Sequence, residues 1–242
     1  MSGYEKSAQL YDHFDHKDNI GFFYHHTNQV GKALDIGAGT GRIAIPLAER
    51  GINVTCVEPS PAMRAVFESK LSAHPLLAER IQLYPNDARS FSINDRFPLA
   101  YLSGTFDHFL DDEERLASLS NIANHLEPKG ILIFDVFLGL MKDSPLIPAG
   151  EIQVGDTVIR RFISGKILPG NLKETTLIYE VYQGEELIQR IEEHSLVGLT
   201  DHSNIRNLLQ NTGFEVYAEW SVYDFTPYQS GDDLLIVEAK KC

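Results

Sequence analysis

The sequence predicts an α/β fold built on a doubly wound sheet, and two observations carry that prediction. An apolar strand over residues 33–36 runs into a turn with Gly37, Gly39 and Gly41, and a helix pattern follows. Strand patterns and amphipathic helix patterns then alternate up to residue 137. Because glycine lets the backbone turn sharply and approach a ligand, we expect a cofactor crevice at the carboxyl end of this first strand.

The other elements of the sheet region follow in order. Ser60 and Pro61 predict the start of a helix, since serine caps helices and proline fits their first turn. Residues 1–30 are rich in aromatic side chains and predict short helices, with Asn19 and Gly21 marking a break. The acidic residues 111–114 suit the start of a helix and are interpreted as structural. Further helices are expected over 42–50 and 113–126, and further strands over 53–58, 81–84, 99–103 and 131–135.

The residues around the turn indicate which cofactor binds. Residues 39–44 satisfy the looser dinucleotide fingerprint, so an NAD-dependent oxidoreductase is one alternative. However, Asp35 lies two residues before Gly37, and the resulting D-x-G-x-G-x-G pattern resembles motif I of the class I S-adenosylmethionine-dependent methyltransferases. Acidic residues after the next two strands, Glu58 and Asp87, also follow the order of that family.

The resemblance implies a role for particular residues. The glycine turn would hold the methionine part of the cofactor, Glu58 its ribose and Asp87 its adenine, while Tyr11 would cover the cofactor or the substrate. A carboxylate after the second strand suits the ribose because it accepts hydrogen bonds from both hydroxyls. The expected cofactor-binding residues are Tyr11, Asp35, Gly37, Ala38, Gly39, Gly41, Glu58, Pro59, Met63, Asp87, Ala88, Ser103, Gly104 and Phe106.

The resemblance also implies a Rossmann-like sheet of seven strands with an antiparallel last strand. The sheet would comprise residues 31–137 and 200–242, with an N-terminal helical cap over 1–30. Residues 138–199 interrupt this order, and we expect an inserted antiparallel β lid there. Its proline- and glycine-containing start, residues 138–150, has the composition of a linker. Three strand-like runs follow it, at 153–164, 173–183 and 187–197.

Methyl transfer needs little from the protein beyond holding a nucleophile in line with the cofactor's sulfonium and excluding water. The predicted function is transfer of a methyl group to a nitrogen or oxygen of a small molecule. An amine attacks without a strong base, whereas a hydroxyl must lose its proton. The base candidates are His108, Tyr11 and His194. A noncatalytic S-adenosylmethionine-binding protein is the second alternative.

Composition limits the partners. A formal charge of −13 over 242 residues argues against a nucleic-acid substrate, which requires a basic surface. The sequence has no signal peptide or long apolar run, so we expect no membrane partner. The chain has only two cysteines, so we expect no disulfide, and the low cysteine content favours the cytoplasm. The histidines lack the spacing of metal ligands, so we expect no metal site. The inserted strands are the segment through which a homodimer would form.

Overall fold

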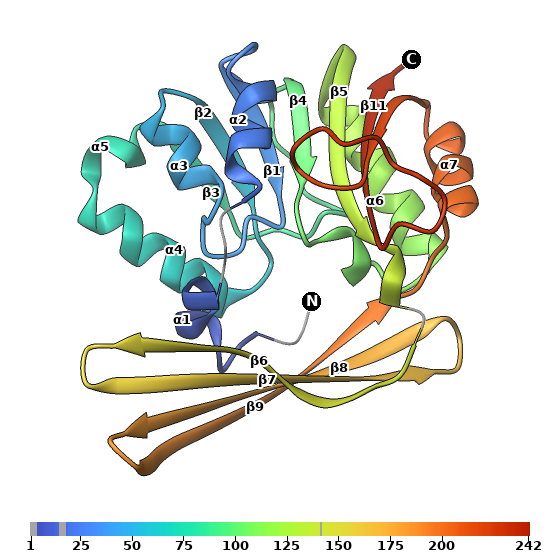
Figure 1. Ribbon diagram of the computed structural model, residues 1–242. Coiled ribbons are helices and arrows are strands. Elements are labelled where there is room, and N and C mark those ends of the chain that lie inside the picture. Colours follow the sequence, from blue (N-terminus) through green and yellow to red (C-terminus); the bar gives the residue numbers. More distant parts are fainter. Residues whose placement is uncertain (1–3, 15–17, 141) are drawn as a thin grey trace.

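The computed structural model describes residues 4–14, 18–140 and 142–242 and contains two sheets (Figure 1). The larger has seven strands in the order β10-β11-β5-β4-β1-β2-β3, and the smaller has four in the order β6-β7-β8-β9. The strands of the larger sheet are β1 (Lys32–Ile36), β2 (Asn53–Val57), β3 (Ile81–Tyr84), β4 (Phe97–Leu102), β5 (Leu126–Phe137), β10 (Phe214–Trp220) and β11 (Leu234–Lys241).

The strand order places a crevice beside β1. Both neighbours of β1, β2 and β4, run parallel to it, and the chain crosses from one side of β1 to the other between β3 and β4. Ligands bind at such switch points because the loops there leave in opposite directions. Strand β11 is antiparallel to both β5 and β10, which confirms the expected seven strands with one antiparallel strand. It lies inside the sheet, where Leu235, Ile236 and Val237 are fully buried.

Helices cover both faces of the larger sheet (Figure 1). On one face α2 (Ile20–Thr27), α3 (Ala44–Glu49), α4 (Pro61–Ala73) and α5 (Pro75–Ala78) pack around a core that includes Phe23, Leu47 and Phe67. On the other, α6 (Asp112–His125) and α7 (His202–Asn211) pack around a core that includes Leu119 and Leu209. No helix among the described residues is long and apolar enough to cross a membrane.

The helix starts follow the sequence signals with one exception. Ser60, Asp111 and Asp201 each accept a backbone N–H bond in the first turn of α4, α6 and α7. The expected break at Gly21 is wrong, because Gly21 lies inside α2. A glycine in the first turn of a helix costs only about 1 kcal/mol, which the burial of Phe22 and Phe23 outweighs. The shorter helices of the N-terminal segment are α1 (Ala8–Tyr11) and η1 (Asp12–Phe14).

The insertion forms an antiparallel sheet of four strands that faces the carboxyl ends of the larger sheet (Figure 1). The strands are β6 (Ser144–Val154), β7 (Thr157–Leu168), β8 (Leu172–Gln183) and β9 (Glu186–Gly198). The linker interpretation is therefore wrong for residues 144–150, which belong to β6. This strand lies at the sheet edge, where Pro145 and Pro148 are tolerated because an edge strand can leave N–H positions unpaired. The run expected at 153–164 is divided by a turn at Gly155.

Candidate functional site

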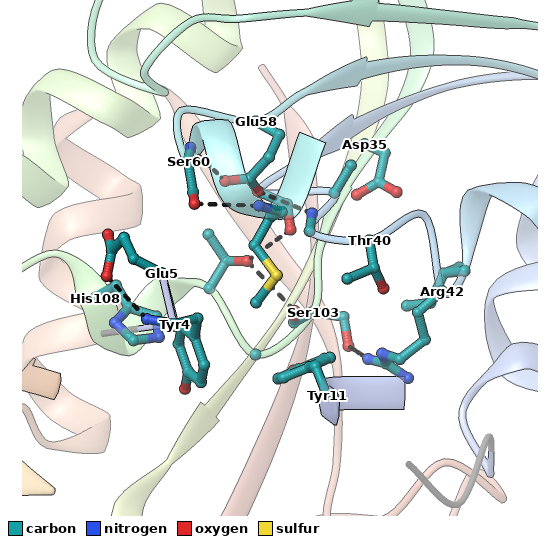
Figure 2. Close-up of a pocket in the computed structure, with 17 residues that line it drawn as sticks. Tyr4, Glu5, Tyr11, Asp35, Thr40, Arg42, Glu58, Ser60, Ser103 and His108 are labelled. Atoms are coloured by element: carbon teal, nitrogen blue, oxygen red, sulfur yellow. Dashed lines mark hydrogen bonds between the residues drawn. The ribbon is translucent and has the colours of Figure 1, made fainter. Parts of the chain in front are cut away.

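A cavity opens at the switch point, between the glycine turn, the N-terminal segment and the loop after β4 (Figure 2). Ten of the predicted residues line it: Tyr11, Asp35, Gly37, Ala38, Gly39, Glu58, Met63, Ser103, Gly104 and His108. The other lining residues, which the sequence analysis did not select, are Tyr4, Glu5, Thr40, Arg42, Ile43, Ser60 and Thr105. Residues as far apart in the chain as Tyr4 and His108 therefore meet at one site, as the fold class predicts.

The glycine turn is held against the end of β2. The backbone N–H groups of Gly37 and Ala38 both donate to the carbonyl of Val57, at 2.8 and 3.2 Å. All three glycines have positive φ, and a Cβ on Gly41 would lie 2.3 Å from the ring of Phe67. A Cβ on Gly39 would meet nothing within 4 Å. Gly41 is therefore required for packing, whereas Gly39 leaves open space where the backbone faces the cavity.

Glu58 joins the second strand to this turn. Its carboxylate accepts the N–H of Gly39 at 2.8 Å and the N–H of Ser60 at 2.7 Å (Figure 2). The residue is 3% exposed, and this burial raises the pKa of its carboxyl above the ordinary value. Each carboxylate oxygen has room for a second hydrogen bond, so Glu58 retains two acceptor positions for a ligand.

Two buried carboxyls support the floor of the cavity. Asp35 accepts the hydroxyl of Tyr101 at 2.9 Å, and burial raises its pKa to about 7. Asp135, at the end of β5, accepts the N–H of Gly104 at 2.6 Å and the hydroxyl of Ser103 at 3.0 Å. These bonds fix the loop after β4, so the cavity has a preformed wall on that side.

Arg42 is the only Lys or Arg among the described residues that line the cavity. Its guanidinium donates to Asn19 at 2.8 Å and to the hydroxyl of Ser103 at 3.2 Å. Asn19 also donates to Ser103, at 3.0 Å. The cation is thereby oriented by two neighbours and lies beside the glycine turn, where it can attract the carboxylate of an amino-acid ligand.

The N-terminal segment, residues 4–14, covers the mouth of the cavity. The ring of Tyr4 packs edge-on against Tyr11 and His108, with centroids 5.4 and 5.8 Å apart (Figure 2). Asp12 accepts hydrogen bonds from the hydroxyl of Thr40 in the glycine turn and from Lys70 of α4. These contacts make the N-terminal segment part of the site. The rings of Tyr4, Tyr11 and His108 lie together at the mouth of the cavity.

The same segment is also bound to the lid. Glu193 of β9 is 4% exposed and accepts three hydrogen bonds, from the N–H of Lys6 and from both the N–H and the hydroxyl of Ser7. The lid reaches His108 as well, through a backbone hydrogen bond with Leu196. Burial lowers the pKa of His108 to about 4, so its imidazole is neutral at neutral pH.

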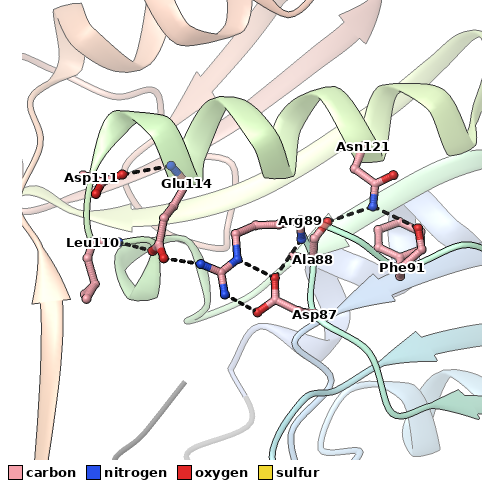
Figure 3. Close-up of polar contacts among 8 residues, drawn as sticks. All are labelled: Asp87, Ala88, Arg89, Phe91, Leu110, Asp111, Glu114 and Asn121. Carbon is pink, nitrogen blue, oxygen red and sulfur yellow. Dashed lines mark hydrogen bonds and ion pairs between the residues drawn. The ribbon is translucent and has the colours of Figure 1, made fainter.

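Six predicted residues do not line the cavity. Gly41 packs on Phe67, and the carbonyl of Pro59 accepts a hydrogen bond from Arg64. The ring of Phe106 is fully buried and stacks on Phe134 at 4.5 Å. The side chain of His194 is half exposed on the lid and pairs with Glu192. Asp87 and Ala88 lie in the loop after β3, where Asp87 pairs with Arg89 (Figure 3).

The residues that the sequence analysis missed had weak signals. Arg42 directly follows the last glycine of the motif, and this position in the sequence could have indicated that it lies at the cavity. Tyr4, Glu5 and Thr105 carry no motif and reach the cavity only through tertiary packing. No group of three or more His, Cys, Asp or Glu among residues 4–14, 18–140 and 142–242 could hold a metal ion.

Comparison with known proteins shows which family the first five strands of the larger sheet resemble. Residues 33–130 match the methyltransferase domain family. This segment of the chain is therefore similar to a methyltransferase domain. Among the curated relatives, the chain is 32% identical over 103 residues to the cypemycin N-terminal methyltransferase of a Streptomyces species, covering 42% of this chain and 40% of the relative. It is 29% identical over 130 residues to an uncharacterized methyltransferase of Oceanobacillus iheyensis, covering 53% of this chain and 57% of the relative. The chain thus spans about half the length of the curated relatives that it matches.

Solved structures resemble the chain over nearly its whole length. A S-adenosylmethionine-dependent methyltransferase from Clostridium acetobutylicum has a TM-score of 0.81 at 18% identity, with 98% of each chain covered. An amino pentose methyltransferase from Micromonospora echinaspora, bound to S-adenosylmethionine, has a TM-score of 0.76 at 17% identity, with 98% and 96% covered. A sugar N-methyltransferase from Streptoalloteichus has a TM-score of 0.73 at 20% identity, with 92% and 87% covered. At these identities the likeness establishes the fold, including the lid.

Proposed function

We propose that this protein is an enzyme that transfers a methyl group from S-adenosylmethionine to an amino nitrogen of a small molecule. The observation that carries the proposal is the contact of Glu58 with Gly39, which sets a buried carboxylate with two spare acceptor positions beside an open glycine turn. Glu58 would accept hydrogen bonds from the two ribose hydroxyls of the cofactor, and Arg42 would pair with the carboxylate of its methionine part. When bound, the cofactor supplies a sulfonium methyl group that is strongly electrophilic.

The outer end of the cavity favours nitrogen over oxygen as the acceptor. A hydroxyl requires a base to remove its proton, and His108, with its pKa lowered to about 4, is too weak a base for that task. A neutral imidazole can still accept a hydrogen bond from an amine and hold it in place. Tyr4 and Tyr11 supply rings that attract a cationic amine or sulfonium. Tyr11 and His108 are therefore proposed as acceptor-positioning residues, and His194 is a weaker candidate because it does not line the cavity.

The names of several relatives support this acceptor class. One relative is named as a sugar N-methyltransferase, another as a methyltransferase of the N-terminus of cypemycin, and a third as a methyltransferase of an amino pentose.

The test is incubation of the protein with S-adenosylmethionine and matched pairs of small molecules that differ only in an amino or a hydroxyl group. We expect S-adenosylhomocysteine and an N-methylated product, identified by mass spectrometry. Methylation of the hydroxyl partner alone would contradict the assignment to nitrogen. Binding of the cofactor without turnover across amino sugars, peptide N-termini and other amines would favour a noncatalytic cofactor-binding protein.

Two further expectations stay as predictions. We propose the reducing cytoplasm as the compartment, in keeping with two free cysteines, Cys56 and Cys242. A homodimer through the lid strands would show twice the chain mass in light scattering after size exclusion, and a monomer at micromolar concentration would contradict it. A nicotinamide cofactor stays the alternative. Parallel titrations with NAD and S-adenosylhomocysteine test it, because binding of NAD alone would favour an oxidoreductase.

A further inference from the structure

Glu5 is the acidic residue that the N-terminal segment brings to the lining of the cavity. Figure 2 shows it beside Tyr4 and His108, on the side of the cavity away from Arg42. Its carboxylate accepts the backbone N–H of Tyr4 at 3.2 Å, and the residue is exposed. A carboxylate therefore lies at the mouth of the cavity, next to the aromatic rings and in contact with water.

The charges of the cavity lining are divided between its two ends. Three charged residues lie around the glycine turn: Asp35, Arg42 and Glu58. At the mouth, burial raises the pKa of Tyr4 above its usual range and lowers that of His108 to about 4, so both rings are neutral at neutral pH. Among the described residues of the lining, Glu5 is thus the one with a formal charge at the mouth.

The chain on both sides of Glu5 is anchored. On one side, the ring of Tyr4 packs edge-on against the two other rings of the mouth. On the other, the backbone N–H of Lys6 donates to the carboxylate of Glu193 in the lid, at 3.1 Å. The ammonium group of Lys6 donates to the carbonyl of Glu192, also at 3.1 Å, and Lys6 does not line the cavity. The segment therefore presents the acid to the cavity and binds the neighbouring cation to the lid.

A carboxylate beside aromatic rings is suited to an ammonium group. The carboxylate accepts charge-assisted hydrogen bonds from the N–H groups of an amine, and the ring faces attract its positive charge. The net charge of −13 also attracts a cation to the protein from a distance. Aliphatic amines carry this charge at neutral pH, as the side chain of lysine does, whereas aromatic amines and amides are neutral.

We propose that Glu5 is a specificity-determining residue that selects a protonated aliphatic amine as the methyl acceptor and holds its ammonium group next to the rings of Tyr4 and Tyr11. This inference rests on the proposed function and narrows the acceptor from amino nitrogens in general to basic, aliphatic ones. The bound nitrogen releases one proton to water at the exposed mouth before it attacks, because only the neutral amine has a free lone pair. Glu5 also offsets the repulsion between the ammonium group and the sulfonium of the cofactor.

The test uses two ligands of the cofactor site that differ in charge where the transferred methyl group would lie. Sinefungin has an amine-bearing carbon in place of the sulfur and so directs an ammonium group toward the acceptor, whereas S-adenosylhomocysteine has an uncharged sulfur. Calorimetry on the full chain gives the ratio of the two dissociation constants. We expect Glu5→Gln to lower the preference for sinefungin about 2–5-fold, the size of an exposed ion pair.

Two controls separate this charge effect from a structural one. The change in the ratio should shrink as NaCl rises from about 0.01 to 1 M, because salt screens exposed charges. Glu185→Gln removes the same charge at an exposed position in the turn between β8 and β9, and it should leave the ratio unchanged.

The remaining outcomes count against the inference. A Glu5→Gln protein that binds both ligands with equally reduced affinity, or with the parent affinities, would overturn it, because a structural role does not change the ratio. Methylation of an aromatic amine as fast as an aliphatic amine of the same size would also overturn it, while leaving the proposed function standing. Failure of the unchanged protein to bind either ligand would refute the proposed function, and the inference with it.

Discussion

Substituting Glu58 by glutamine is the sharpest test of the cofactor site. The carboxylate makes two backbone hydrogen bonds and has two acceptor positions left for ribose hydroxyls. An amide of the same size keeps one acceptor oxygen, and its NH₂ group must face the N–H of either Gly39 or Ser60. A hydrogen bond to a charged group contributes about 1.5–3 kcal/mol, so loss of one corresponds to about 10–100-fold weaker binding of S-adenosylhomocysteine.

The effect on folding should be smaller. One buried N–H loses its acceptor, which costs about 1–3 kcal/mol, but removal of a buried negative charge offsets part of that cost. We therefore expect a folded Glu58→Gln protein whose Tm falls by no more than about 4 °C. Calorimetric titration with S-adenosylhomocysteine gives the affinity, and Glu127→Gln, at an exposed glutamate of β5, is the control. An affinity unchanged from that of the parent protein would remove Glu58 from the site and refute the reasoning.

Three further predictions concern the turn, the buried carboxyl and the lid contact. Gly41→Ala should lower the free energy of unfolding by about 2–4 kcal/mol, because the added Cβ overlaps the packed ring of Phe67 at a residue with positive φ. Gly39→Ala, whose Cβ meets no neighbour, should lower it by about 1 kcal/mol and mainly weaken cofactor binding. Equal losses for the two variants in chemical denaturation would contradict this contrast. Asp35, with its pKa raised to about 7, binds a proton between about pH 4 and 7 that the unfolded chain releases, so stability from this group falls as pH rises through that window. Asp35→Asn should gain stability relative to the parent as pH rises from 4 to 7 in urea melts, and parallel curves would show that this carboxyl does not titrate there. Glu193→Ala removes three hydrogen bonds to the N-terminal segment and should speed dissociation of S-adenosylhomocysteine about 3–10-fold in stopped-flow measurements, with no change if the segment does not cover the bound cofactor.

The sequence by itself determined the larger sheet and the part of the site that the glycine turn and Glu58 form. The signals there are local: an apolar strand, three glycines whose positive φ only glycine adopts readily, and an acid directly after the next strand. Parallel strands bring their carboxyl ends to one edge, so Asp35, Gly39 and Glu58 had to meet once the fold class was known. Capping residues such as Ser60 and Asp111 fixed helix starts for the same local reason.

Only the tertiary structure decided the part of the site that the N-terminal segment and the loop after β4 form. Tyr4 and Glu5 reach the cavity because Glu193, some 190 residues away, binds the backbone between them and α1, and no short-range pattern encodes that contact. Phe106 was expected at the cofactor, but stacking on Phe134 buries its ring in the core. Side-chain direction depends on packing against distant partners, so a motif places a residue near a site without deciding whether its side chain enters it.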